Sequence, residues 1–175
     1  MKSHFTVSNN EATIVMPTGT GKTETMLSYI VSEKLEQVLI ILPSILLRDQ
    51  TYNKCKTLGL ISQFKILNEN ALLPNVCLLK KIPSDKETLE NITRNVNIIV
   101  STIGIVSRLN DEQINVLKKT CNVVIIDEAH HIAAKTWNNV KSKFKPLKII
   151  QFTATPFRND NKKIDGKIIY NYPLS

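Results

Sequence analysis

The stretch MPTGTGKT at 16–23 limits the possible folds of this chain more than any other part of it. An apolar run, Ala12–Met16, leads into it, and a helical pattern from Lys22 to Leu35 follows. A strand, a glycine-containing loop and a helix, in this order, are what a phosphate-binding P-loop requires. Gly19 and Gly21 allow backbone angles that side chains disfavour, so backbone N–H groups can approach phosphate closely. The stretch therefore predicts a nucleotide-binding α/β domain.

Each part of the loop has a predicted role. The helix that opens at Lys22 offers unpaired N–H groups and the positive end of its dipole to an anion. The Lys22 ammonium suits the β- and γ-phosphates, and the Thr23 hydroxyl suits Mg²⁺. The strict P-loop pattern has glycine where this chain has Met16, a departure that removes no phosphate-binding group. The predicted nucleotide-binding residues are Thr18, Gly19, Thr20, Gly21, Lys22, Thr23 and Glu24.

Strand and helix patterns alternate along the rest of the chain. Strands are expected at 12–16, 38–42, 76–79, 97–100, 123–126 and 148–152, with a shorter candidate at 64–67. Helices are expected at 22–35, 44–56, 84–95, 111–119 and 133–144, the third of them capped by Ser84 with Glu87. This alternation predicts a three-layer α/β fold with a mostly parallel central sheet. We expect one domain over 1–160, followed by a tail at 161–175.

Two acidic residues, Asp127 and Glu128, directly follow the continuous apolar run Val123–Ile126. The carboxyl ends of parallel strands meet at one edge of the sheet, so this pair should lie near the phosphate loop. Asp127 can hold Mg²⁺, and Glu128 can orient or deprotonate a water. The alternative is a pair of solvated acids at a strand end. Thr153 and Thr155, after a neighbouring strand, can hydrogen-bond these carboxylates or His130, or simply begin a turn.

Net charge and cysteine content indicate what kind of partner and which compartment suit this chain. Lys and Arg number 23 against 15 Asp and Glu, which gives a net charge of +8 and favours a polyanionic partner. No apolar run approaches the ~20 residues of a membrane span, and no secretion signal is evident. The three cysteines are widely spaced without a C-x-x-C pair, which is typical of reduced thiols in the cytoplasm and does not favour zinc.

Taken in order, these motifs resemble the first motor lobe of superfamily 2 helicases and translocases of the Asp-Glu-Ala-His type. Residues 16–23 match motif I, 127–130 match motif II, and 153–156 match motif III. Looser matches run from Leu42 to Gln50 and over 101–103. The resemblance covers roughly residues 12–160. It implies a RecA-like P-loop domain that binds ATP and Mg²⁺ and contacts nucleic acid.

The resemblance also assigns roles to individual residues. It implies that Lys22, Thr23, Asp127 and Glu128 carry out ATP hydrolysis and that Thr23 and Asp127 bind Mg²⁺. Coupling of the nucleotide state to nucleic acid falls to His130, Thr153 and Thr155. Contacts with the phosphate backbone fall to Pro43, Arg48 and Thr102, although Arg48 can also be read as a solvated charge on a helix face. The sequence at 153–158 resembles that of restriction and repair translocases, which favours DNA over RNA as the nucleic acid.

Two departures from the family pattern shape the expectation. No convincing adenine-reading glutamine precedes motif I, and the second RecA-like lobe with its arginine fingers lies outside these residues. We therefore expect nucleotide binding with very slow hydrolysis by this chain alone. Two other functions remain open at this point: a P-loop ATPase that does not act on nucleic acid, and a non-catalytic nucleotide-sensing module.

Overall fold

A computed structural model describes residues 1–175 except 8–10, 69, 129–133, 156–165 and 173–175. The strands are β1 (Ala12–Val15), β2 (Val38–Leu42), β3 (Val76–Leu78), β4 (Ile98–Thr102), β5 (Val123–Ile126), β6 (Lys148–Thr153) and β7 (Lys167–Asn171). The helices are α1 (Lys2–Val7), α2 (Lys22–Ser32), α3 (Ile45–Thr57), α4 (Gly59–Gln63), α5 (Lys86–Thr93), α6 (Ile103–Val106), α7 (Asp111–Thr120) and α8 (Ala134–Phe144). No helix among the described residues is long and apolar enough to cross a lipid bilayer.

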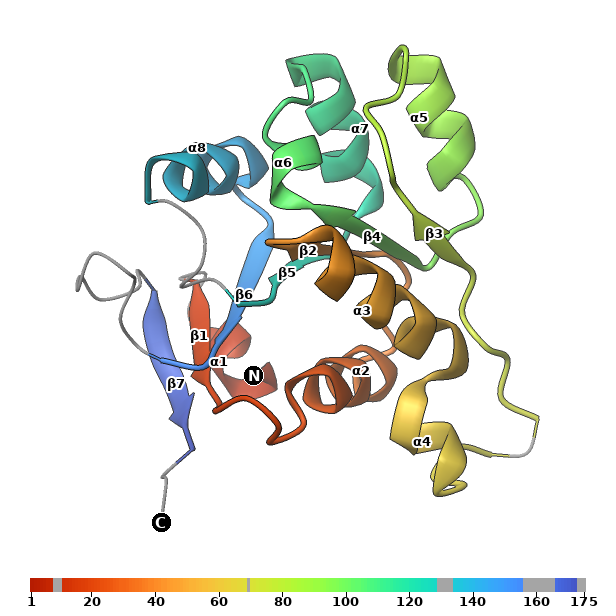
Figure 1. Ribbon diagram of the computed structural model, residues 1–175, viewed down its shortest axis with the longest axis vertical. Coiled ribbons are helices and arrows are strands. Elements are labelled where there is room, and N and C mark those ends of the chain that lie inside the picture. The colour runs from red at the N-terminus through yellow and green to blue at the C-terminus, as the bar shows by residue number, and fades with distance from the viewer. Residues whose placement is uncertain (8–10, 69, 129–133, 156–165, 173–175) are drawn as a thin grey trace.

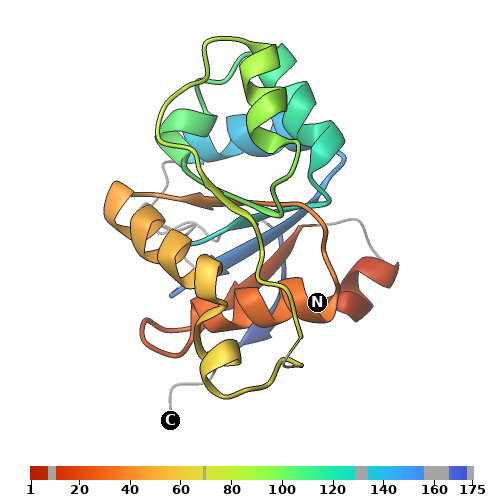
Figure 2. The ribbon, with the colours of Figure 1, turned by 90° about the vertical axis from the view of Figure 1, so that its right-hand side faces the viewer.

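The strands form one parallel sheet in the order β3-β4-β2-β5-β6-β1-β7. Helices α5–α8 lie on one side of the sheet and α1–α4 on the other, as the two views show (Figures 1 and 2). The predicted three-layer α/β fold with a parallel central sheet is thus confirmed. In this order β6 separates β1, which leads into the P-loop, from β5, which leads into the acidic pair.

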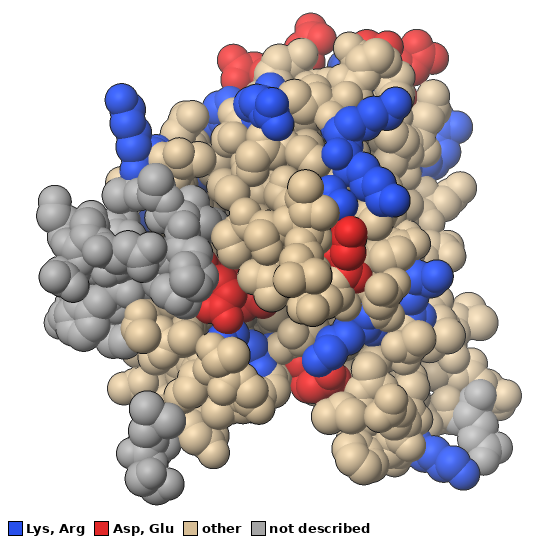
Figure 3. Space-filling view, viewed as in Figure 1, with Lys and Arg blue, Asp and Glu red and all other residues tan. Residues whose placement is uncertain are grey.

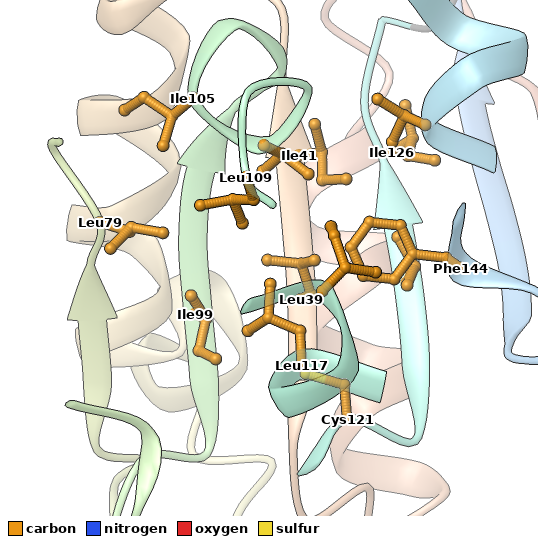
Figure 4. Packing of buried hydrophobic residues seen from close by; sticks show 14 of the residues in the cluster. Leu39, Ile41, Leu79, Ile99, Ile105, Leu109, Leu117, Cys121, Ile126 and Phe144 are labelled. Atoms are coloured by element: carbon orange, nitrogen blue, oxygen red, sulfur yellow. The ribbon is translucent and has the colours of Figure 1, made fainter. Parts of the chain in front are cut away.

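Both faces of the central strands are buried, which explains why their sequences are continuously apolar. In β2 the side chains alternate between two hydrophobic clusters. Leu39 and Ile41 join the cluster beneath α7 and α8, where Leu117 and Phe144 pack against them (Figure 4). Val38, Ile40 and Leu42 join the cluster on the opposite face. These two layers hold the strand ends, and with them the candidate site, in fixed positions.

Two local predictions are wrong. The strand candidate at 64–67 is absent, because α4 ends in a turn in which the Phe64 N–H donates to the Leu60 carbonyl at 2.9 Å. Helix α5 is capped by Asp85 rather than Ser84: an Asp85 carboxylate oxygen accepts the Thr88 N–H at 2.7 Å. That bond, with further bonds from the Thr88 and Ser84 hydroxyls, lowers the pKa of Asp85.

Part of the segment expected to be a tail belongs to the sheet. Residues 167–171 form β7, which pairs in parallel with β1. The Lys167 N–H donates to the Glu11 carbonyl at 2.8 Å, and the Tyr172 N–H donates to the Val15 carbonyl at 2.9 Å. Ile169 packs against the cluster that contains Ile14. The strand that leads into the P-loop is therefore paired on both sides.

Candidate nucleotide site

The loop after β1 has the backbone conformation that its glycines predict. Gly19 and Gly21 have φ angles of 83° and 90°, in the left-handed region that side chains disfavour. The Thr20 hydroxyl donates to the Pro17 carbonyl at 2.7 Å and closes the loop. Helix α2 begins immediately after Gly21, and the Thr25 hydroxyl donates to the Gly21 carbonyl at 3.1 Å. The start of α2 is thereby fixed to the loop.

Lys22 meets the acidic pair across the sheet edge. Its Nζ lies 2.6 Å from Oε1 of Glu128, and it also donates to the Met16 carbonyl at 3.4 Å. Only 8% of Lys22 and 9% of Glu128 is exposed, so this ion pair is shielded from water. The predicted convergence of the amine and the acids on one place is observed.

A tight turn at the end of β5 presents the two acids. The Asp127 N–H continues the ladder by donating to the Ile41 carbonyl at 3.0 Å. Glu128 then adopts a left-handed φ of 51°, which costs a non-glycine residue about 1–2 kcal/mol. The Asp127 Oδ1 accepts the Glu128 N–H at 2.9 Å and stabilises this turn. The turn places both carboxylates on the same cleft as Lys22.

The surroundings of Asp127 favour a cation. Burial, and after it the negative charge of Glu128, raise the pKa of Asp127 to about 6. The Lys22 ammonium and the Glu128 N–H act in the opposite direction on this pKa. A carboxylate that is costly to ionise in the free protein gains from a bound metal cation, which offsets that cost.

These residues line one wall of a cleft of ≈ 590 Å³. Thr18, Gly19, Lys22, Thr23 and the acidic pair form this wall, and residues of α3 and α4 form the other. Acidic side chains are visible near the middle of one face of the molecule, with basic side chains beside them (Figure 3). The cleft therefore combines backbone N–H groups, one buried ammonium and carboxylates.

The oxygen donors in this cleft fit a magnesium ion. The Thr23 hydroxyl and the Asp127 carboxylate are hard ligands of the kind that Mg²⁺ prefers. Within the described residues, no group of three or more His, Cys, Asp or Glu side chains is arranged to hold a metal ion by itself. Such a sparse donor set suits a metal whose other ligands are phosphate oxygens and water.

Comparison with known proteins identifies the family. The family model described as "Type III restriction enzyme, res subunit" matches residues 1–158. The chain belongs to this family. Among curated proteins, none matches the sequence.

Solved structures of helicases share the fold of this Res-subunit family member. The UvsW helicase of bacteriophage T4 aligns with a TM-score of 0.56 and 14% identity over 85% of this chain and 48% of UvsW. A hypothetical ATP-dependent RNA helicase of Sulfolobus tokodaii gives a TM-score of 0.61 and 22% identity over 85% of this chain and 43% of that one. The Hef helicase domain of Pyrococcus furiosus aligns with a TM-score of 0.55 and 21% identity over 85% of this chain and 31% of that one. The chain thus spans less than half of each of these proteins, and it shares their α/β fold over that part.

Motif III of this Res-subunit family member lies against the P-loop strand. The Thr153 carbonyl accepts the Met16 N–H at 2.8 Å, and the Thr153 hydroxyl donates to the Thr155 carbonyl at 2.8 Å. Thr153 is buried, whereas Thr155 is exposed. His130 and Pro156 lie outside the described residues. The structure thus brings Thr153, but not the exposed Thr155, into the core beside motif I.

The predicted nucleic-acid residues differ in exposure. Leu42 pairs with Thr102 across β2 and β4, which places Pro43 beside Thr102 at the sheet edge. Pro43 is partly exposed, but Thr102 is only 7% exposed and Arg48 only 4%. Arg48 bonds Asp49 at 2.8 Å. The reading of Arg48 as a solvated charge is therefore wrong, and its guanidinium is not presented to a polyanion in this conformation.

Glu24, the last of the predicted nucleotide-binding residues, makes contacts that the prediction did not include. It lines the cleft, but its carboxylate lies 3.0 Å from Lys54 Nζ and accepts the Leu60 N–H at 3.0 Å. The wall formed by α3 and α4 was missed entirely because it carries no phosphate-binding motif. The only sequence signal for it is Gly59, in the short stretch Leu58-Gly59-Leu60.

Proposed function

We propose that this chain is the ATP-binding lobe of an ATP-dependent nucleic-acid translocase or helicase. The observation that carries the proposal is the 2.6 Å contact between Lys22 and Glu128 at the edge of a P-loop sheet. The family and the fold described above support the same function. Residues 1–160 together with β7 would form the lobe, and a second RecA-like lobe would complete the motor.

The residues of the cleft would divide the chemistry as follows. Backbone N–H groups of the loop and the Lys22 ammonium would bind the β- and γ-phosphates of ATP. Thr23 and Asp127 would hold Mg²⁺, which supplies charge neutralisation of the phosphates. Glu128 would orient the attacking water and accept its proton.

The ion pair between Lys22 and Glu128 suggests how ATP prepares the site. In the free protein each group stabilises the buried charge of the other. A triphosphate that binds Lys22 would replace Glu128 as its partner. Glu128 would then be available to a water beside the γ-phosphate, so the proton acceptor would become competent only when the substrate is present.

The proposed polymer is DNA, in a restriction or repair system. The net charge of +8 favours a polyanionic partner. The sequence Thr-Ala-Thr-Pro-Phe-Arg at 153–158 resembles that of DNA translocases. The description of the matching family, a type III restriction enzyme subunit, agrees with this proposal. His130, Thr153 and Thr155 would link the nucleotide to the DNA. The free thiols of Cys55, Cys77 and Cys121 suit a reducing compartment, and we propose the cytoplasm.

Calorimetry and turnover together test this function. Titration with a non-hydrolysable MgATP analogue should give saturable binding, and Glu128→Gln should retain that binding. ATP turnover should be very low in the chain alone and should respond to single- or double-stranded DNA more than to RNA. An absence of nucleotide binding at millimolar concentration would exclude the function. Turnover that no nucleic acid changes would instead favour a P-loop ATPase without a polymer substrate.

A further inference from the structure

The carboxylate of Glu24 joins three segments that are distant in the sequence. Glu24 follows the P-loop residues Lys22 and Thr23 in the first turn of α2. One of its oxygens lies 3.0 Å from Lys54 Nζ in α3, and the other accepts the Leu60 N–H of α4 at 3.0 Å. The carboxylate is mostly shielded, with 16% of the side chain exposed. Glu24 thus fastens the start of the P-loop helix to the junction of α3 and α4.

The α3–α4 junction is shaped to receive this carboxylate. Leu58 and Gly59 both have left-handed backbone angles, with φ of 57° and 52°. A Cβ atom on Gly59 would lie 2.5 Å from Oε2 of Glu24, so a side chain at this position would displace the Glu24 carboxylate. Leu58 and Ile61 are buried on either side and anchor the junction in the core. Only glycine leaves room here for the bond between Glu24 and the Leu60 N–H.

The same junction forms the second wall of the nucleotide cleft. The residues of α3, α4 and their connection that line the cleft are Leu47, Asn53, Lys54, Thr57, Gly59, Leu60 and Gln63. The P-loop forms the facing wall, and Glu24 is a direct polar link between the two walls. The ion pair with Lys54 is half-exposed and contributes little, so the charge-assisted bond to the Leu60 N–H carries most of this link.

We propose that Glu24 is a positioning residue that couples nucleotide binding at the P-loop to the α3–α4 junction. This inference rests on the proposed nucleotide function. Phosphate bound at Lys22 and Thr23 orders the first turn of α2, and that turn carries Glu24. The junction in turn ends α3, the helix that begins beside Pro43 at the sheet edge. Nucleotide occupancy is thereby transmitted to α3 through one carboxylate.

Hydrogen exchange of the 175-residue chain with and without MgADP tests the coupling. MgADP should slow exchange of the Leu60 amide by roughly tenfold, the size expected for securing one charge-assisted hydrogen bond. Glu24→Ala, measured at an MgADP concentration that saturates the variant, should lose this slowing. Glu24→Gln should keep most of it, because its amide oxygen can still accept the Leu60 N–H. The matched control is Glu112→Ala, which removes an exposed acid from the first turn of α7 and should change nothing.

A second pair of variants keeps the test independent of folding defects. Gly59→Ala should displace the carboxylate and remove the nucleotide effect in the wild-type background, but should add nothing to Glu24→Ala. Wild-type chain that fails to bind MgADP would refute the proposed function itself. Wild-type chain that binds MgADP without slowing Leu60 exchange would overturn only the coupling. Slowing that persists undiminished in Glu24→Ala would overturn it too.

Discussion

The nucleotide cleft and the predicted nucleic-acid surface lie on the same edge of the sheet, yet the sequence specifies them to different degrees. In the cleft, Lys22 and Glu128 come from segments more than a hundred residues apart and meet at 2.6 Å. On the predicted nucleic-acid surface, Arg48 and Thr102 are 4% and 7% exposed. The first region is assembled as its motifs predict, and the second is largely covered.

The difference comes from how each region is built. The motif residues of the cleft lie in loops that follow buried strands or directly after such loops, so the sheet topology sets their positions. Arg48 lies inside helix α3, near its start, where the rotation of the helix against the core decides which side chains are exposed. In α3 the buried residues are Arg48, Thr51 and Cys55, a stripe with little apolar character. A pattern of hydrophobic residues therefore cannot identify the inner face of this helix.

The largest expected effect concerns the acidity of Asp127 in the metal-free protein. Its pKa rises from 3.8 to about 6 on folding, so the folded state holds this proton more tightly than the unfolded state. The contribution is fully present below pH 3.8 and is lost as pH rises through 6; two pKa units correspond to about 3 kcal/mol. Urea unfolding without Mg²⁺ from pH 4 to 7 should show this loss in the wild type relative to Asp127→Asn. Parallel pH profiles of the two proteins would contradict it.

Removal of the Lys22 ammonium should weaken nucleotide binding strongly. Charge-assisted hydrogen bonds contribute about 1.5–3 kcal/mol, so Lys22→Ala should raise the MgATP dissociation constant roughly 10- to 150-fold. Calorimetry measures this change directly. Lys80→Ala, which removes an exposed lysine outside the cleft lining, is the control and should bind as the wild type does. Equal affinities for Lys22→Ala and wild type would mean that the buried amine does not meet phosphate.

Arg48→Ala should affect the stability of the fold rather than nucleic-acid binding. Its aliphatic stem is buried and its guanidinium bonds Asp49, so truncation should destabilise the chain by about 1–3 kcal/mol. Fluorescence anisotropy with a labelled oligonucleotide should show less than a twofold change in affinity. Lys56→Ala removes an exposed charge from the same helix and should weaken oligonucleotide binding at least as much. A large, specific loss of oligonucleotide affinity in Arg48→Ala would restore the role that its motif implies.

Strand positions and the cleft could be predicted because they depend on local composition and topology. The runs at 38–42 and 123–126 are apolar throughout, and the structure has strands with the same bounds. The role of Glu24 could not be predicted, because it depends on a contact with residues 30 and 36 positions away. The prediction of a strand at 64–67 was wrong because a short apolar run does not indicate whether a neighbouring strand is available for pairing. Phe64 and Ile66 are each 70% exposed instead.

The smallest expected effect concerns the exposed beginning of α3. Ile45 and Leu46 are 64% and 69% exposed, directly after Ser44 at the end of β2, so this turn rather than Arg48 faces solvent at the sheet edge. Leu46→Ser should change the free energy of unfolding by less than about 0.5 kcal/mol and leave MgATP affinity unchanged. It should weaken oligonucleotide binding by roughly twofold, which corresponds to about 0.4 kcal/mol.

The control for this effect is Leu72→Ser, which removes a side chain that is 94% exposed and lies in the chain segment before β3. If both variants bind the oligonucleotide equally, the beginning of α3 is no more involved than any other exposed leucine. If only Leu46→Ser weakens binding, the nucleic-acid surface begins at the exposed start of α3 and excludes the buried face of this helix that carries Arg48. In both the nucleotide cleft and the nucleic-acid surface, the residues that bind the ligand would then be those that follow closely after a strand.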